Sequence, residues 1–265
     1  MFTDNFSKAK EDHSQWNVFS PHDKYHGSHH ESGMPYLGDK FPEDGVVTIS
    51  IDPGIKNFAM RMTRFYTDGT YHLIYFRNLD FTSMVPKEEC SENKGLATAS
   101  PVILQAITKT FMASLTGLAE ARIICIERQM AKNVKATKIF HHVLGLFLTC
   151  QALGIMKYPC CIFDFSPKLK GKMLGAPERA TYNELKAWSI EKAIEICTHT
   201  NDQDSIRIIK GVKGRSKTKG DDLSDTITQL MAFYCCLGPN GFYELFHTEG
   251  PQKFHCAYSY ETVSK

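Results

Sequence analysis

The distribution of apolar and polar residues changes at Gly45 and divides the chain into two parts. Residues 1–44 show no apolar periodicity and contain five of the eleven histidines, which is typical of a flexible, solvated tail. Clustered histidines can also bind a metal ion, so that alternative stays open. From residue 46 onward, a β-branched run ends at Asp52 and is followed by Pro-Gly, which predicts a strand and then a turn.

Beyond this first strand, short apolar runs alternate with longer segments of helical spacing. Three strands in succession, followed by alternating helices and strands, are typical of an α/β domain with a mixed sheet flanked by helices. We expect five strands, three antiparallel and then parallel ones, in a domain over residues 45–238, with a polar loop at 82–98 and a C-terminal extension at 239–265. The predicted strands span 46–52, 58–66, 71–76, 123–126 and 160–163, and the predicted helices span 102–118, 136–153, 184–197 and 223–237.

Composition narrows the class of protein. The chain has 265 residues, of which 42% are hydrophobic and 23% charged, as in an ordinary globular protein. Its net charge of +2 means that binding to nucleic acid would depend on local basic patches. Nine cysteines without a Cys-x-x-Cys pair favour reduced thiols over a zinc site, and the N-terminus lacks an apolar signal core. We therefore expect an intracellular protein with neither a secretion signal nor a membrane span.

Four acidic residues lie where predicted strands end or a predicted helix begins. Asp52 and Glu127 close the first and fourth strands, and Asp222 and Asp225 open the last helix. Each has a simpler interpretation, since aspartate is common before Pro-Gly turns and acids favour the first turn of a helix. Glu127 is harder to explain, because burying an acid after an apolar strand is costly unless a cation, for example Arg128, compensates its charge.

Taken together, the four acids predict a site for hard divalent cations. Residues three apart on a helix share a face, so Asp222 and Asp225 are expected to point at one place. Converging carboxylates are typical ligands of Mg²⁺ or Mn²⁺. Two such ions about 3.5–4 Å apart can activate water and stabilise the leaving oxygen when a phosphodiester is cleaved.

Three basic segments lead into or away from the proposed ligands, which favours contacts with phosphate. Any one of them alone could be ordinary solvated surface. Residues 205–220 contain no acid, and their glycine, serine and threonine content predicts a loop, while a second basic loop is expected after the fifth strand. The basic residues are Lys132, Lys135 and Lys138 in the first segment, Lys168, Lys170, Lys172 and Arg179 in the second, and Arg207, Lys210, Lys213, Arg215, Lys217 and Lys219 in the third.

An ordered set of motifs resembles the RuvC-like Holliday-junction resolvases. The Ile-Asp-Pro-Gly of residues 51–54 is similar to the first strand of the bacterial enzymes, and its continuation to Asn57 resembles the poxvirus and fungal mitochondrial ones. Glu-Arg-Gln at 127–129 and Ser-Pro at 166–167 resemble later poxvirus motifs. Residues 221–225, Asp-Asp-Leu-Ser-Asp, resemble the closing Asp-Asp-x-x-Asp motif.

This resemblance implies an RNase H-like fold and a homodimer that makes paired nicks across four-way DNA junctions. It implies that Asp52, Glu127, Asp222 and Asp225 bind two Mg²⁺ or Mn²⁺ ions. Lys56 and Arg128, which lie beside two of these acids in the sequence, are further expected DNA contacts. Asp221 stands where bacterial enzymes carry a histidine, so its role stays open. The poxvirus-like motifs suggest a large DNA virus, with the protein acting at a cytoplasmic replication site or in the host nucleus.

Helix 136–153 is the candidate for the dimer interface. It has apolar residues on more than one stripe, and one stripe must face the sheet. A second stripe, with residues such as Phe140, Leu144 and Phe147, would bind a partner or be buried in a central helix.

Other functions are weighed against a junction resolvase. Asp-x-Gly after a first strand also opens actin-like kinases, but the chain lacks their second half and their glycine-rich phosphate loops. A repair nuclease of the same fold acting on flaps or other branched DNA is the main alternative. A non-catalytic DNA-binding module is disfavoured, because a surface for phosphates would not gather four acids.

Overall fold

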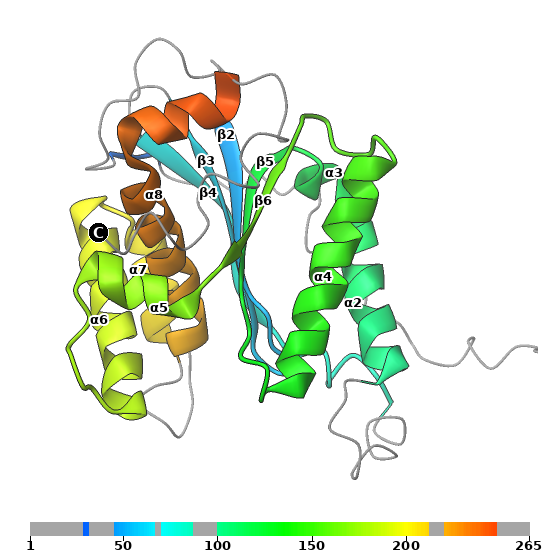
Figure 1. Cartoon of the computed structure of the whole chain (residues 1–265), viewed down its shortest axis with the longest axis horizontal. Coiled ribbons are helices and arrows are strands. Elements are labelled where there is room, and N and C mark those ends of the chain that lie inside the picture. Colours follow the sequence, from blue (N-terminus) through cyan, green and yellow to red (C-terminus); the bar gives the residue numbers. More distant parts are fainter. Residues whose placement is uncertain (1–28, 32–44, 67–69, 87–99, 212–219, 248–265) are drawn as a thin grey trace, which may run out of the picture.

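The protein is a three-layered α/β structure in which one sheet separates two groups of helices (Figure 1). A computed structural model describes residues 29–31, 45–66, 70–86, 100–211 and 220–247. Helices α2 (Pro101–Ala113) and α4 (Val134–Ala152) cover one face of the sheet, with the short α3 (Leu115–Leu118) between them in sequence. The other face carries α5 (Pro167–Leu174), α6 (Tyr182–His199), α7 (Gln203–Gly211) and α8 (Asp221–His247).

The sheet confirms the predicted mixed topology. Strands β2 (Val46–Asp52), β3 (Phe58–Phe65) and β4 (Thr70–Leu79) form an antiparallel meander. Strands β5 (Ala121–Glu127) and β6 (Cys161–Phe165) then extend it in parallel, with β5 beside β2. Since helices cover both faces, β2 is buried on both sides, and of its seven residues only Asp52 is partly exposed.

A sixth strand was not predicted. β1 (His29–Glu31) pairs antiparallel with β4 and forms the edge of the sheet, in the order β1-β4-β3-β2-β5-β6. The prediction of a tail without regular structure over 1–44 is therefore wrong for these three residues. The outer side of β4 offers unpaired backbone groups, and an extended segment can pair with them whatever side chains it carries. The apolar periodicity of the sequence therefore does not predict this strand.

Both predicted basic loops contain helices. Helix α5 begins after Ser166 with Pro167 at its first position and ends at Gly175, whose φ of 74° is the left-handed conformation typical of a helix end. Helix α7 is capped by Asp202, whose carboxylate accepts a hydrogen bond from the Ser205 amide at 2.9 Å. These short helices were not predicted, because their many basic residues are also typical of loops. Residues 212–219 lie outside the described part of the chain.

The remaining helices differ from prediction mainly at their ends. The helix expected at 102–118 is divided at Ser114, which ends α2 and precedes α3. Helix α8 starts at Asp221 and continues to His247, through the boundary proposed at residue 238. In the described part of the chain, no helix has the length and apolar character needed to cross a membrane.

Two of the residues expected in the dimer interface on α4 lie in the core of the molecule instead. Phe140 and Phe147 are 4% and 2% exposed and pack with β2 and β5 residues in the molecule's own core. They cannot belong to an outward stripe, because the amphipathic face of α4 is directed at the sheet. Leu144 is partly buried against the same core, and Leu148 is 46% exposed.

A buried ion pair fixes the start of α7 to β3, the middle strand of the meander. The Arg61 guanidinium on β3 donates to Asp202 at 2.8 Å and to the Ser205 hydroxyl at 2.6 Å. The Tyr71 hydroxyl donates to the same Asp202 oxygen at 2.8 Å. Burial alone would raise the pKa of Asp202, but Arg61 and the hydrogen bonds from Ser205 lower it to about 2.

Breaking this pair is expected to destabilise the fold strongly. Arg61→Met leaves the Asp202 carboxylate buried without its cation, and we expect the free energy of unfolding to fall by about 3–5 kcal/mol in urea titrations. Arg207→Met is the matched control, because Arg207 forms an exposed pair with Asp204 on the same helix, α7, and pairs of that kind contribute about 0–1 kcal/mol. Equal losses in the two variants would contradict this role for Arg61.

Candidate metal centre

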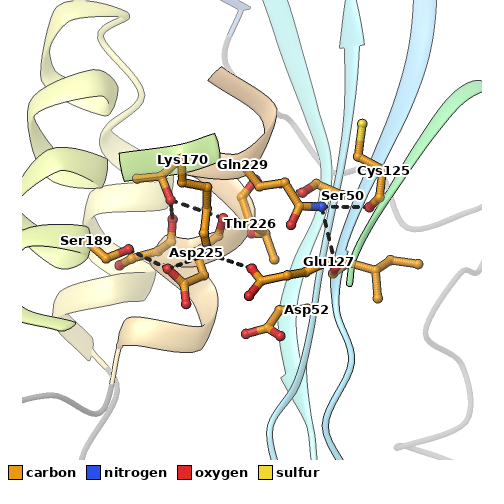
Figure 2. A network of polar contacts seen from close by, with 12 residues as sticks. Ser50, Asp52, Cys125, Glu127, Lys170, Ser189, Asp225, Thr226 and Gln229 are labelled. Carbon is orange, nitrogen blue, oxygen red and sulfur yellow. Dashed lines mark hydrogen bonds and ion pairs between the residues drawn. The ribbon is translucent and has the colours of Figure 1, made fainter. Parts of the chain in front are cut away.

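Three of the four predicted acids meet at one edge of the sheet. Asp52, Glu127 and Asp225 each offer a carboxylate oxygen, and these oxygens lie within 4.8 Å of one another. Figure 2 shows them converging from β2, β5 and α8. Strands β2 and β5 are parallel neighbours with Ile51 opposite Ile126, so the acids that follow these residues end the two strands side by side.

Helix α8 is held against these strands by buried polar contacts. The Ser50 hydroxyl on β2 donates to the Thr226 carbonyl at 2.8 Å. The Gln229 amide lies one turn beyond Asp225 and donates to the carbonyls of Cys125 at 2.9 Å and Ile51 at 3.5 Å (Figure 2). The side chain of Gln229 therefore connects α8 to both strands that carry an acid, and it sets how far Asp225 stands from the other two.

Sequence reasoning missed Gln229. It is fully buried in the amphipathic helix α8, among apolar neighbours such as Leu230. The sequence could have indicated its role, because Gln229 is a long polar side chain on the apolar face of a predicted helix. A buried amide must find hydrogen-bond partners.

Lys170 lies inside the acidic group, where the prediction placed a phosphate contact. Its ammonium is 2.5 Å from a Glu127 oxygen and 3.0 Å from an Asp225 oxygen, and the residue is 6% exposed. Because α5 is a helix with about 100° between successive residues, Lys170 points about 160° away from both neighbouring lysines, Lys168 and Lys172. Those two are exposed, and the prediction of DNA contact by Lys170 is corrected.

Arg128 is not the partner of Glu127. Its guanidinium donates to both carboxylate oxygens of Asp164 on β6, at 2.8 and 2.7 Å, and both side chains are well exposed. Successive residues at a strand end point to opposite sides, which separates Arg128 from the buried Glu127. The neighbouring Gln129 reaches Asp52, with its amide nitrogen 3.4 Å from a carboxylate oxygen.

Asp222 lies outside the three-acid group. Burial, together with the charges of Asp221 and Asp225, raises the pKa of Asp222 to about 7, although Lys186 partly offsets them. Asp221, whose role the sequence left open, is buried and forms an ion pair with the partly exposed Lys186 on α6. Unlike Asp222, Asp225 belongs to the three-acid group, and the buried Ser189 hydroxyl orients its carboxylate by donating a hydrogen bond at 2.6 Å.

The electrostatics of the group favour an added cation. Burial raises the pKa of Asp52 well above its usual value, and the charges of Glu127 and Asp225 add to the effect. Burial also raises the pKa of Glu127, although Lys170 opposes this. Three carboxylates thus face a single ammonium, and an all-oxygen donor set of this kind fits a hard ion such as Mg²⁺ or Mn²⁺.

Exposed basic residues lie along the edge that carries the acids. They follow the carboxyl ends of β2, β5 and β6, where the chain leaves the sheet next to the acidic group. Lys210, at the end of α7, is exposed as well, whereas Lys213, Arg215, Lys217 and Lys219 lie outside the described residues. The exposed residues at the strand ends are Lys56, Arg128, Lys132, Lys135, Lys168 and Lys172.

The sequence has viral relatives. No protein-family model matches it. It is 29% identical over 218 residues to the uncharacterized protein 97L of Invertebrate iridescent virus 3, a match that covers 69% of this chain and 97% of the relative. It is 30% identical over 129 residues to the uncharacterized protein 170L of Invertebrate iridescent virus 6, covering 43% of this chain and 50% of that relative.

The solved structures similar to this chain include a Holliday junction resolvase. The yeast mitochondrial Holliday junction resolvase Ydc2 aligns with a TM-score of 0.50 at 15% identity, covering 78% of this chain and 84% of Ydc2. Thermus thermophilus RuvC aligns with a TM-score of 0.41 at 16% identity over 73% of this chain and 98% of RuvC, and its complex with a Holliday junction gives the same score. The likeness to Ydc2 confirms the RNase H-like fold.

Removal of the Gln229 amide should loosen the acidic group without unfolding the protein. For Gln229→Leu we expect Mn²⁺ to bind about tenfold more weakly in calorimetric titrations, since residues that orient ligands typically change metal affinity by about 10–100-fold. Thr228→Val is the control, because the Thr228 hydroxyl is equally buried but bonds only to carbonyls of its own helix. Unchanged Mn²⁺ affinity in Gln229→Leu would rule out the positioning role.

Proposed function

We propose that this protein is a metal-dependent DNA endonuclease that resolves four-way junctions by symmetric paired nicks. The observation that carries the proposal is the convergence of Asp52, Glu127 and Asp225 at one edge of an RNase H-like sheet. A fold shared with a junction resolvase does not define activity, so the argument depends on the chemistry of this site.

The acids supply what phosphodiester hydrolysis needs from a protein. Asp52, Glu127 and Asp225 would hold a Mg²⁺ or Mn²⁺ ion, and Asp222 is the candidate to complete a second site next to them. A bound ion would lower the pKa of a coordinated water and stabilise negative charge on the phosphate. The chain's own residues orient the ligands, since Ser189 fixes Asp225 and Gln129 contacts Asp52.

The surface around the acids suits a nucleic acid. Exposed lysines on three separate segments, such as Lys56, Lys132 and Lys168, lie near the strand ends that carry the acids, where they can contact phosphates. A purely DNA-binding module would not gather three like charges at one place, because they repel phosphate and raise one another's pKa. This combination favours a nuclease over a binding module.

Paired nicks require two active sites, and we propose a homodimer through helix α4. Two sites related by a two-fold axis can cut strands of like polarity at symmetric positions. Because Phe140 and Phe147 are buried in the core, the contact would use the outer surface of α4, where Leu148 is exposed.

The relatives in two iridescent viruses support a viral setting for this activity. We propose that the protein acts in recombination or concatemer resolution at the site of viral DNA replication. A repair nuclease that acts on flaps or other branched DNA is the alternative, because the same acidic site could cut either substrate.

A cleavage assay with four DNA substrates tests the proposal. With Mg²⁺ or Mn²⁺, we expect cutting of a synthetic four-way junction at symmetric positions and at least about tenfold slower cutting of a flap, an RNA–DNA hybrid and plain duplex. Asp52→Asn, Glu127→Gln and Asp225→Asn should each lower the rate at least about a hundredfold while junction binding persists, because each removes a ligand charge. Glu191→Gln, on the exposed side of α6, is the control and should cut normally.

Each possible result has a distinct meaning. Preference for the flap would favour the repair nuclease. Full activity of Asp52→Asn and Glu127→Gln would refute the site, and cutting undiminished by a chelator would refute the metal requirement.

A further inference from the structure

Lys170 is a buried cation within the proposed metal centre. Its ammonium contacts Glu127 at 2.5 Å and Asp225 at 3.0 Å, and Figure 2 shows it reaching between these acids from the side opposite Asp52. Its charge also lowers the pKa of Asp52, although the structure gives no direct contact between the two. One side chain thus compensates an acid from β5 and an acid from α8 together.

The helix that carries Lys170 is itself firmly placed. Leu169, Met173 and Leu174 pack against an apolar cluster that includes residues of β5, β6 and α8. Withdrawal of the ammonium from the acids would require a new rotamer in a crowded place or a shift of α5. The buried lysine is stabilised by two carboxylates, and without them it would lose most of its charge compensation.

The charges of the group limit the number of ions it can take. The three carboxylates carry three negative charges when ionised, and Lys170 neutralises one of them. A single divalent ion would then bring the group to neutrality. Two divalent ions in the presence of the ammonium would leave it net positive, even when the charge of the neighbouring Asp222 is added, and this is unfavourable in a partly buried site.

We propose that the Lys170 ammonium occupies the position of a second cation, so that the protein without DNA binds a single divalent ion. The inference rests on the proposed metal site and deepens it. Lys170 acts here as a positioning residue and counter-ion, and a second ion can enter only if its ammonium leaves the acids.

Counting bound Mn²⁺ tests this directly. Electron paramagnetic resonance measures free Mn²⁺ during titration of the full-length protein, in the absence of DNA. We expect one ion per chain in the wild type and two in Lys170→Met, with the first ion bound at least about tenfold more tightly because a competing positive charge is gone. Lys192→Met is the matched control, since Lys192 pairs with Glu195 on α6, and it should bind one ion.

The outcomes separate this inference from the proposed function. Two ions on the wild-type protein, or a single ion bound with unchanged affinity by Lys170→Met, would overturn the role of Lys170 and leave the nuclease proposal intact. No bound Mn²⁺ on any variant, together with no cleavage, would instead refute the metal site itself. If circular dichroism shows that Lys170→Met is unfolded, the wild-type count decides: one ion supports the inference and two overturn it.

Discussion

Repulsion among three carboxylates is the constraint on which the rest of this structure depends. Oxygens of Asp52, Glu127 and Asp225 lie within 4.8 Å of one another, in surroundings that strongly favour the uncharged form of Asp52. Such an arrangement is unfavourable for folding unless positive charge is close. Lys170 provides part of this charge, and the remaining negative charge is what would attract a divalent cation.

The scaffold resists this repulsion through connections made elsewhere. Parallel pairing of β2 with β5 fixes two of the acids, and the contacts of Ser50 and Gln229 fix α8, which carries the third. The Arg61–Asp202 pair holds α7, the last described element before α8, to the meander. Favourable contacts in the rest of the fold therefore offset the unfavourable free energy of the acidic group, as is common at functional sites.

The sequence predicts the strands and helices that carry the site better than it predicts the contacts within the site. Strand β2 has the predicted bounds, because a β-branched run that ends in Asp-Pro-Gly admits few alternatives. Asp52, Glu127 and Asp225 could be foreseen, since acids at strand ends and helix starts must meet where the elements meet. Lys170 could not, because a lysine between Lys168 and Lys172 looks like exposed surface until the segment is known to be helical.

The account's central claim is that these three acids bind a divalent cation. The most direct measurement is an anomalous difference map from a crystal soaked in Mn²⁺. The account predicts a peak within coordination distance of carboxylate oxygens from Asp52, Glu127 and Asp225. A fully soaked crystal with no peak among these acids, or with its strong peak at the N-terminal histidines instead, would contradict it.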